Sequence, residues 1–75
     1  MKNNSVYVIL HCFGNTEEEL ENNIIINEGM VEEIYFKKDE AEKRTEEYNN
    51  IVSYRYELYG NIYFNKYVVF EKTVY

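Results

Sequence analysis

Apolar and polar residues alternate with a period of two in several parts of this chain, as they do in β-strands. Residues 5–13 form an apolar and aromatic run with large side chains on both faces, and residues 30–36 form a second run that two acids interrupt. Residues 51–59 and 67–75 alternate apolar with polar side chains. The pattern predicts four strands. The first is expected at the centre of a sheet, because both of its faces need a cover.

One segment, residues 36–50, has the period of a complete helix. Asp39 is expected to cap its first turn, and Glu42 lies three residues on, as in a capping box. Its charges are spaced to pair along the helix, as Asp39 with Lys43 and Glu40 with Arg44. Its apolar face is narrow and consists of Ala41, Thr45 and Tyr48. A helix with so small a face is expected to lie against a sheet.

The segment between the first two strands is long and acidic. Thr16 and Glu19 repeat the spacing of a capping box, which predicts one or two helical turns. The apolar run of residues 24–26 predicts either a brief strand or a buried plug, and Asn27-Glu28-Gly29 then predicts a turn.

The last two strands can be joined in two ways. Gly60-Asn61 has the composition of a two-residue hairpin turn. Asn65-Lys66 is the alternative, and it would make residues 51–64 one long bent strand. The sequence alone leaves both open.

These elements predict one α+β domain over residues 1–75. The expected fold is a two-layer sandwich, with an approximately four-stranded, mainly antiparallel sheet and one main helix, at about residues 39–50, on one face. The second face of the first strand would then be covered by aromatic side chains or by another subunit. Several of the nine tyrosines are expected on that face, as a candidate aromatic surface of Tyr7, Tyr35, Tyr59, Tyr63 and Tyr67. Such a surface suits a dimer, a docked partner, a stack of bases or simple cross-strand packing.

The net charge of −6 is unevenly distributed. Residues 17–47 hold twelve of the fourteen acids and four of the eight bases, a local balance of −8. Acidic proteins repel a phosphate backbone, so direct nucleic-acid binding is not expected, whereas a protein partner with a basic surface would be attracted. Acidic surfaces also serve solubility alone. The candidate partner-binding residues are Glu17, Glu18, Glu19, Glu21, Glu28, Glu32 and Glu33.

No constellation of residues predicts catalysis or a metal site. His11 and Cys12 are the only histidine and cysteine, and as neighbours on a strand they point to opposite faces. They therefore cannot act together as base and nucleophile, and they leave no set of ligands for a metal. Adjacent acids such as Glu46 and Glu47 lack the desolvated pocket that a general acid needs. Neither an enzyme nor a cofactor is expected.

The single cysteine suits a reducing cytoplasm. No apolar run approaches the roughly 20 residues that span a bilayer, and the first residues lack the features of a signal peptide. We therefore expect a cytoplasmic protein without membrane contact.

Four stretches together resemble small bacterial and phage domains of unknown function. They are Val-Tyr-Val-Ile-Leu-His, Val-Glu-Glu-Ile-Tyr-Phe, Lys-Asp-Glu-Ala-Glu-Lys-Arg-Thr-Glu-Glu-Tyr-Asn and Tyr-Arg-Tyr-Glu-Leu. The resemblance covers about residues 5–59 and implies a strand-strand-helix-strand-strand fold in a bacterial host; the acidic segment of residues 16–29 is not part of it. Short acidic proteins of this kind also resemble phage-encoded inhibitors of bacterial defence, anti-CRISPR proteins among them.

Two functions are expected from these observations. The first is a non-enzymatic acidic protein that occupies a basic, nucleic-acid-binding surface, as a phage inhibitor of a CRISPR-type complex would. The alternative is a binding protein or sponge for a nucleotide-like ligand, enclosed by a dimer of aromatic sheets.

Overall fold

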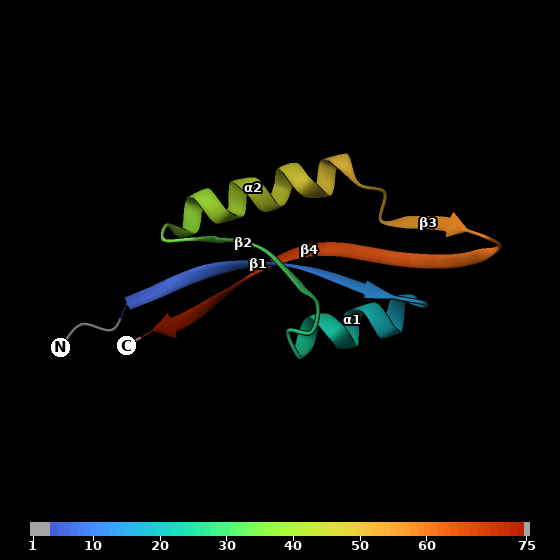
Figure 1. Cartoon of the computed structure of the whole chain (residues 1–75), viewed down its shortest axis with the longest axis horizontal. Coiled ribbons are helices and arrows are strands. Elements are labelled where there is room, and N and C mark those ends of the chain that lie inside the picture. The colour runs from blue at the N-terminus through green and yellow to red at the C-terminus, as the bar shows by residue number, and fades with distance from the viewer. Residues whose placement is uncertain (1–3, 75) are drawn as a thin grey trace.

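The computed structural model describes residues 4–74 as one open antiparallel sheet with two helices (Figure 1). The elements in chain order are β1 (Asn4–Gly14), α1 (Glu17–Ile25), β2 (Met30–Tyr35), α2 (Lys38–Ile51), β3 (Arg55–Leu58) and β4 (Asn61–Val74). The strands lie in the order β2-β1-β4-β3. The predicted α+β fold is confirmed, with four antiparallel strands and the main helix on one face of the sheet.

The long pair of β1 and β4 forms the centre of the sheet. Their register runs from Asn4 opposite Val74 to Gly14 opposite Phe64. β2 pairs with the middle of β1 and contains a bulge next to Ile9 and Leu10. β3 pairs only with the start of β4, so these two strands extend beyond both helices as a hairpin (Figure 1).

α2 covers the sheet face that Ile9 and Tyr67 occupy. Ala41 is fully buried between them, which lets the helix lie close to the strands as its small apolar face predicts. The predicted cap is wrong, because Lys37 is the N-cap residue and makes no side-chain hydrogen bond there. Asp39 lies inside the first turn, where its charge still favours the positive end of the helix dipole.

α1 lies on the opposite face, as Figure 1 shows, and closes a second core around Leu10, Cys12 and Leu20. The Thr16 hydroxyl accepts a hydrogen bond from the Glu19 N–H at 3.0 Å, so the predicted cap is confirmed. A Cβ on Gly14 would stand 2.4 Å from the backbone nitrogen of Leu20, because α1 packs directly on this glycine.

The prediction for residues 24–26 is wrong. Ile24 and Ile25 belong to α1, and Ile26 is its C-cap, so there is neither a strand nor a plug. Leu20 and Ile24 lie four residues apart on a helix and both pack against the second core. Ile25 and Ile26 are 77% and 63% exposed.

The hairpin turns at Tyr59 and Gly60, one residue earlier than Gly60-Asn61. Both have positive φ, 51° and 79°, as a type I′ turn requires. The alternative at Asn65-Lys66 is wrong, since both residues lie inside β4. The third strand is shorter than predicted, because α2 continues to Ile51 and residues 52–54 form the linker that leads to β3 at Arg55.

Among residues 4–74, no helix is long and apolar enough to cross a membrane.

Candidate functional site

The carboxylates of α1 form the most uniform charged surface of the described chain. Its residues Glu17, Glu18, Glu19 and Glu21 are all exposed, and the helix contains no lysine or arginine. Within residues 4–74 none of these four acids makes an ion pair; the ion pairs there are Lys38–Glu42, Arg44–Glu33, Arg44–Glu47 and Arg55–Glu57. We call these four residues the α1 acidic surface.

The backbone of α1, which carries these acids, is anchored to the sheet. Leu20 is 1% exposed and anchors the helix in the second core. The Asn23 side-chain amide donates to the Phe13 carbonyl at 2.7 Å, which ties the second half of the helix to the end of β1. Anchoring of this kind reduces the entropy that the acids would lose on binding.

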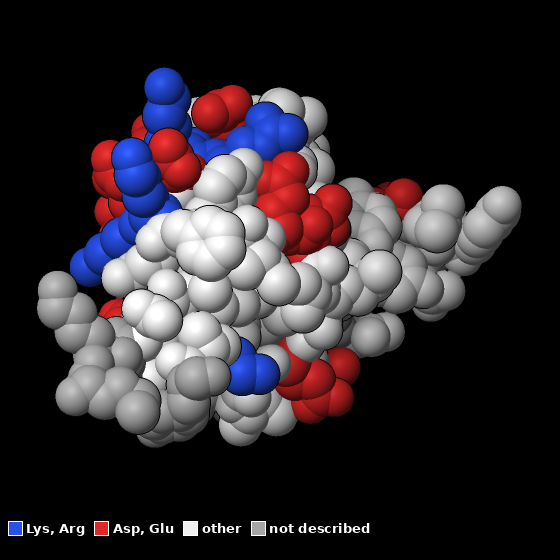
Figure 2. Space-filling model, turned by 60° about the vertical axis from the view of Figure 1, so that its left-hand side comes forward, with Lys and Arg blue, Asp and Glu red and all other residues white. Residues whose placement is uncertain are grey.

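The acids of α2 are in part neutralised by bases of the same helix. Lys38 approaches Glu42 at 3.8 Å, and Arg44 approaches Glu47 at 3.3 Å. The predicted pairs of Asp39 with Lys43 and of Glu40 with Arg44 do not form among the described residues. Figure 2 accordingly shows lysine or arginine next to aspartate or glutamate over α2, and beside them a broad area without charge.

Glu33 differs from the other predicted partner-binding acids, because neighbouring side chains already bind its carboxylate. It accepts hydrogen bonds from the hydroxyls of Tyr35 and Tyr48, the latter at 2.6 Å, and from Arg44 Nε at 3.5 Å. These hydroxyls, with the Arg44 charge, lower the pKa of the Glu33 carboxyl. The same bonds raise the pKa of both tyrosines.

The remaining two predicted acids, Glu28 and Glu32, lie outside α1. Glu28 is exposed in the turn between α1 and β2, and Glu32 is exposed at the bulge of β2. The structure therefore brings four of the seven predicted acids together on one helix.

The predicted aromatic surface does not form. Tyr67 is 6% exposed in the core beneath α2, and Tyr7 and Tyr35 pack against the same core. Tyr63 stacks on Tyr56 in the hairpin, and Tyr59 is 95% exposed at its tip. The face of β1 that carries Tyr7 was expected to lie away from the main helix, but it is the face that α2 covers.

The structure instead contains a continuous aromatic stack on the α2 side of the sheet. Centroid distances are 4.1 Å from Phe13 to His11, 3.9 Å from His11 to Tyr67 and 4.6 Å from Tyr67 to Tyr48. Arg44 lies 4.4 Å over the ring of Tyr48 at the far end. These contacts join β1, β4 and α2, so no local pattern in the sequence predicts them.

His11 and Cys12 have structural surroundings on opposite faces, as predicted. His11 Nε2 lies 2.8 Å from Asn65 Oδ1, and the Asn65 amide nitrogen donates to the Ser53 carbonyl at 2.7 Å. The Asn65 side-chain oxygen can only accept, so the His11 Nε2–H donates this hydrogen bond. Cys12 is fully buried, and burial raises the pKa of its thiol, which disfavours the reactive thiolate.

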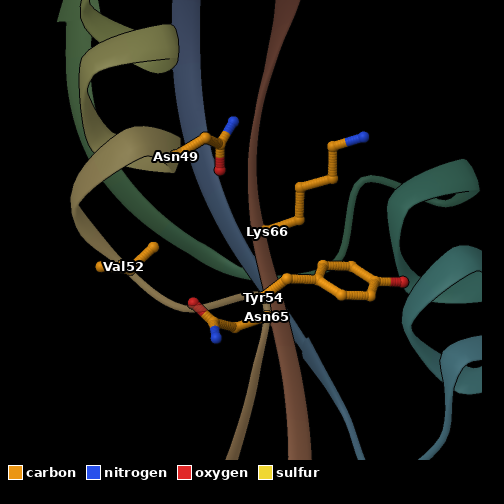
Figure 3. A pocket seen from close by; sticks show the side chains of 5 residues that line it. All are labelled: Asn49, Val52, Tyr54, Asn65 and Lys66. Atoms are coloured by element: carbon orange, nitrogen blue, oxygen red, sulfur yellow. The ribbon is translucent and has the colours of Figure 1, made fainter.

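Two hollows flank the linker between α2 and β3. The larger, of about 390 Å³, is an open groove at the Phe13 end of the aromatic stack, lined by His11, Phe13, Val52, Ser53, Tyr56 and Asn65. The smaller, of about 160 Å³, is lined by Asn49, Val52, Tyr54, Asn65 and Lys66 (Figure 3). In Figure 3 the Tyr54 ring points towards α1, and desolvation together with the charges of Glu17 and Glu21 raises the pKa of its hydroxyl.

Within residues 4–74, no three His, Cys, Asp or Glu side chains come together in a way that would hold a metal ion.

No protein-family model, curated protein or solved structure gives a significant match to this chain.

Proposed function

We propose that this protein is a non-enzymatic binding protein whose α1 acidic surface occupies a basic, nucleic-acid-binding surface of another protein. In its sharper form, the proposal is a phage-encoded inhibitor of a CRISPR-type defence complex in the bacterial cytoplasm. The carboxylates of Glu17, Glu18, Glu19 and Glu21 would take the places that phosphates occupy in the natural complex.

The observation that carries the proposal is that these four acids, unlike several of α2, have no ion-pair partner within residues 4–74. Exposed charges that are not already paired are the ones free to attract an opposite charge. Their helix is anchored by Leu20 and capped by Thr16, so binding would require little ordering of the chain.

A charge-reversal experiment tests the proposal. One variant changes Glu17, Glu18, Glu19 and Glu21 to Lys. The matched control changes four exposed acids of α2 to Lys, Asp39, Glu40, Glu42 and Glu46, so both carry the same net change. Each tagged protein is used to capture partners from a bacterial lysate, which mass spectrometry identifies.

We expect the wild type and the α2 control to capture a nucleic-acid-binding protein that the α1 variant loses. Added DNA or RNA should release it, and so should 1 M NaCl, because salt at that concentration screens exposed charges beyond about 3 Å. A partner that the α1 variant captures equally well, or that nucleic acid does not displace, would contradict the proposal.

A second candidate function is supported by the open groove of about 390 Å³. Its volume lies in the range of small-molecule sites, and the rings of Phe13 and Tyr56 in its lining could stack on a planar, nucleotide-like ligand. Native mass spectrometry of protein purified from its host would show the ligand as added mass, which Tyr56→Ala should remove. A wild-type spectrum without added mass would contradict this function and leave the first untouched.

A further inference from the structure

On the outer strand β2, Val31 and Ile34 lie on the α1 side of the sheet, and Met30, opposite His11, lies on the α2 side. With Ile25, Ile26 and Phe36 they make six large, exposed apolar side chains between the end of α1 and the start of α2. We call them the apolar edge. Their exposed fractions are 77% for Ile25, 63% for Ile26, 63% for Met30, 60% for Val31, 59% for Ile34 and 85% for Phe36. All lie within twelve consecutive residues. Several large exposed apolar side chains gathered along one strand edge are typical of an interaction site.

The fold explains why these side chains remain uncovered. Val31 and Ile34 lie opposite Leu10 and Val8 of β1, so they share the sheet face of the second core. α1 covers only one end of that face, and no other helix of the described residues lies below it (Figure 1). β2 is also an outer strand, and its free side carries unpaired backbone groups that can accept another strand.

We propose that a second copy of this chain docks on the apolar edge, with the two β2 strands side by side and antiparallel. This surface is separate from the α1 acidic surface, and the proposal does not rest on the proposed function.

The order of charges around the edge favours a copy of the same chain as its occupant. Glu32 precedes Ile34 in the chain, and Lys37 and Lys38 follow Phe36. Two antiparallel β2 strands that cross near residues 34–35 therefore bring Glu32 of each copy near Lys37 and Lys38 of the other, which follow the end of β2 at Tyr35. A two-fold interface needs this self-complementarity. Elsewhere, two chains of net charge −6 repel each other.

The size of the apolar edge also suits a dimer. A standard interface buries roughly 800 Å² on each partner. Six large side chains exposed by 59–85% present an area of that order. A chain of 75 residues has a small core, so burying this surface would add stability that the monomer lacks.

The mass of the full-length protein in solution tests the proposal. Sedimentation velocity from about 5 to 500 μM should show twice the chain mass of 9.1 kDa at the higher concentrations. Ile34→Glu places a charge in the interface and should leave a monomer throughout. Ile51→Glu is the matched control: Ile51 is 77% exposed at the end of α2, away from the edge, and this variant should still dimerise.

A second variant tests the interface in case Ile34→Glu does not fold. Phe36→Glu lies outside β2 and changes a side chain that is 85% exposed, so the fold should tolerate it while dimerisation is lost. Circular dichroism would verify the fold of all three variants. A wild type that sediments as a monomer over the whole range would overturn the proposal, and so would dimers of folded Ile34→Glu and Phe36→Glu.

Discussion

Tyr59 has an unfavourable backbone conformation, and its side chain makes little packing contact that would offset the cost. Its φ of 51° is left-handed, which costs an ordinary residue roughly 1–2 kcal/mol, and its side chain is 95% exposed. Asn followed by Gly is the preferred pair in such a turn. We expect Tyr59→Asn to raise the free energy of unfolding by about 1 kcal/mol, measured by urea denaturation.

Tyr59→Ala provides the control, because it removes the same side chain but retains the unfavourable φ. Its free energy of unfolding should stay close to that of the wild type. If Tyr59→Asn were no more stable than Tyr59→Ala, the turn would not be the source of the cost.

Glu33 links the end of β2 to α2 and makes this contact depend on pH. Because its folded pKa is lowered, the carboxylate contributes stability above its unfolded pKa of about 4.3, and that contribution is lost as the pH falls through the lower folded value. We expect Glu33→Gln to cost about 1 kcal/mol at pH 7. The difference between wild type and variant should shrink towards pH 3 in urea titrations.

Glu32→Gln is the control for this prediction, since Glu32 is the exposed neighbour of Glu33. It should change the free energy of unfolding by less than about 0.5 kcal/mol at either pH. A pH-independent loss in Glu33→Gln would mean that packing, and not the charge, holds Tyr35 and Tyr48.

The Asn49 side chain joins α2 to β4, because it hydrogen-bonds the backbone of β4 as a neighbouring strand would. β3 pairs with β4 only as far as Phe64, and beyond it the Asn49 amide both donates to the Tyr67 carbonyl and accepts from the Tyr67 N–H, each at 2.8 Å. Removing the amide leaves both backbone groups without these partners. We expect Asn49→Ala to lower the free energy of unfolding by about 2 kcal/mol, measured by urea denaturation.

The neighbouring Asn50 offers a matched control, because it is the same residue on the same helix but exposed. Asn50→Ala should leave stability within about 0.5 kcal/mol of the wild type. Equal losses in the two variants would show that helix propensity, not the edge contact, accounts for the effect of Asn49.

The elements were predictable where local signals agreed with one another. α2 spans Lys38–Ile51 against a prediction of residues 39–50, since its period, charges and flanking strands all favoured a helix. The length of α1 was missed because residues 24–26 have the composition of a strand. There, packing of Leu20 and Ile24 on β1 and β4 outweighs β-propensity.

The candidate site could be predicted only where its residues are neighbours in the sequence. The α1 acids follow one another in the sequence, and they are exposed as expected. Of the three partners of Glu33, only Tyr35 is local, two residues along the same strand. Arg44 and Tyr48 come from α2, eleven and fifteen residues further on, and no spacing rule connects them with Glu33. The faces of Tyr7, Tyr35 and Tyr67 were misassigned because β1 is apolar on both sides, so its pattern does not show which side α2 covers.

The whole molecule uses its two sheet faces differently. α2 runs along one face and closes it with a core, an aromatic stack and its own ion pairs. α1 covers only part of the other face and presents acids and apolar side chains that the described chain does not pair or bury. The α1 acidic surface lies on this less complete side and the apolar edge runs along β2 beside it, whereas the open groove lies at the end of the aromatic stack on the α2 side.

The same charge distribution predicts how salt affects stability. A net charge of −6 on a body of 53 × 23 × 15 Å produces repulsion that unfolding relieves. The Debye length falls from about 30 Å at 10 mM salt to about 10 Å at 100 mM, so added salt should screen this repulsion. At one protein concentration and pH 7, we expect the free energy of unfolding to rise by on the order of 1 kcal/mol between 10 and 100 mM NaCl.

Replacing Glu17, Glu18, Glu19 and Glu21 with Gln changes the net charge from −6 to −2, and this variant should respond to salt more weakly than the wild type. The response should also fade near the isoelectric point of about 4.7, where the net charge vanishes. A free energy of unfolding that falls as NaCl is added would contradict this prediction. In that case the exposed pairs Lys38–Glu42 and Arg44–Glu47, which salt weakens, would outweigh the repulsion among the unpaired acids.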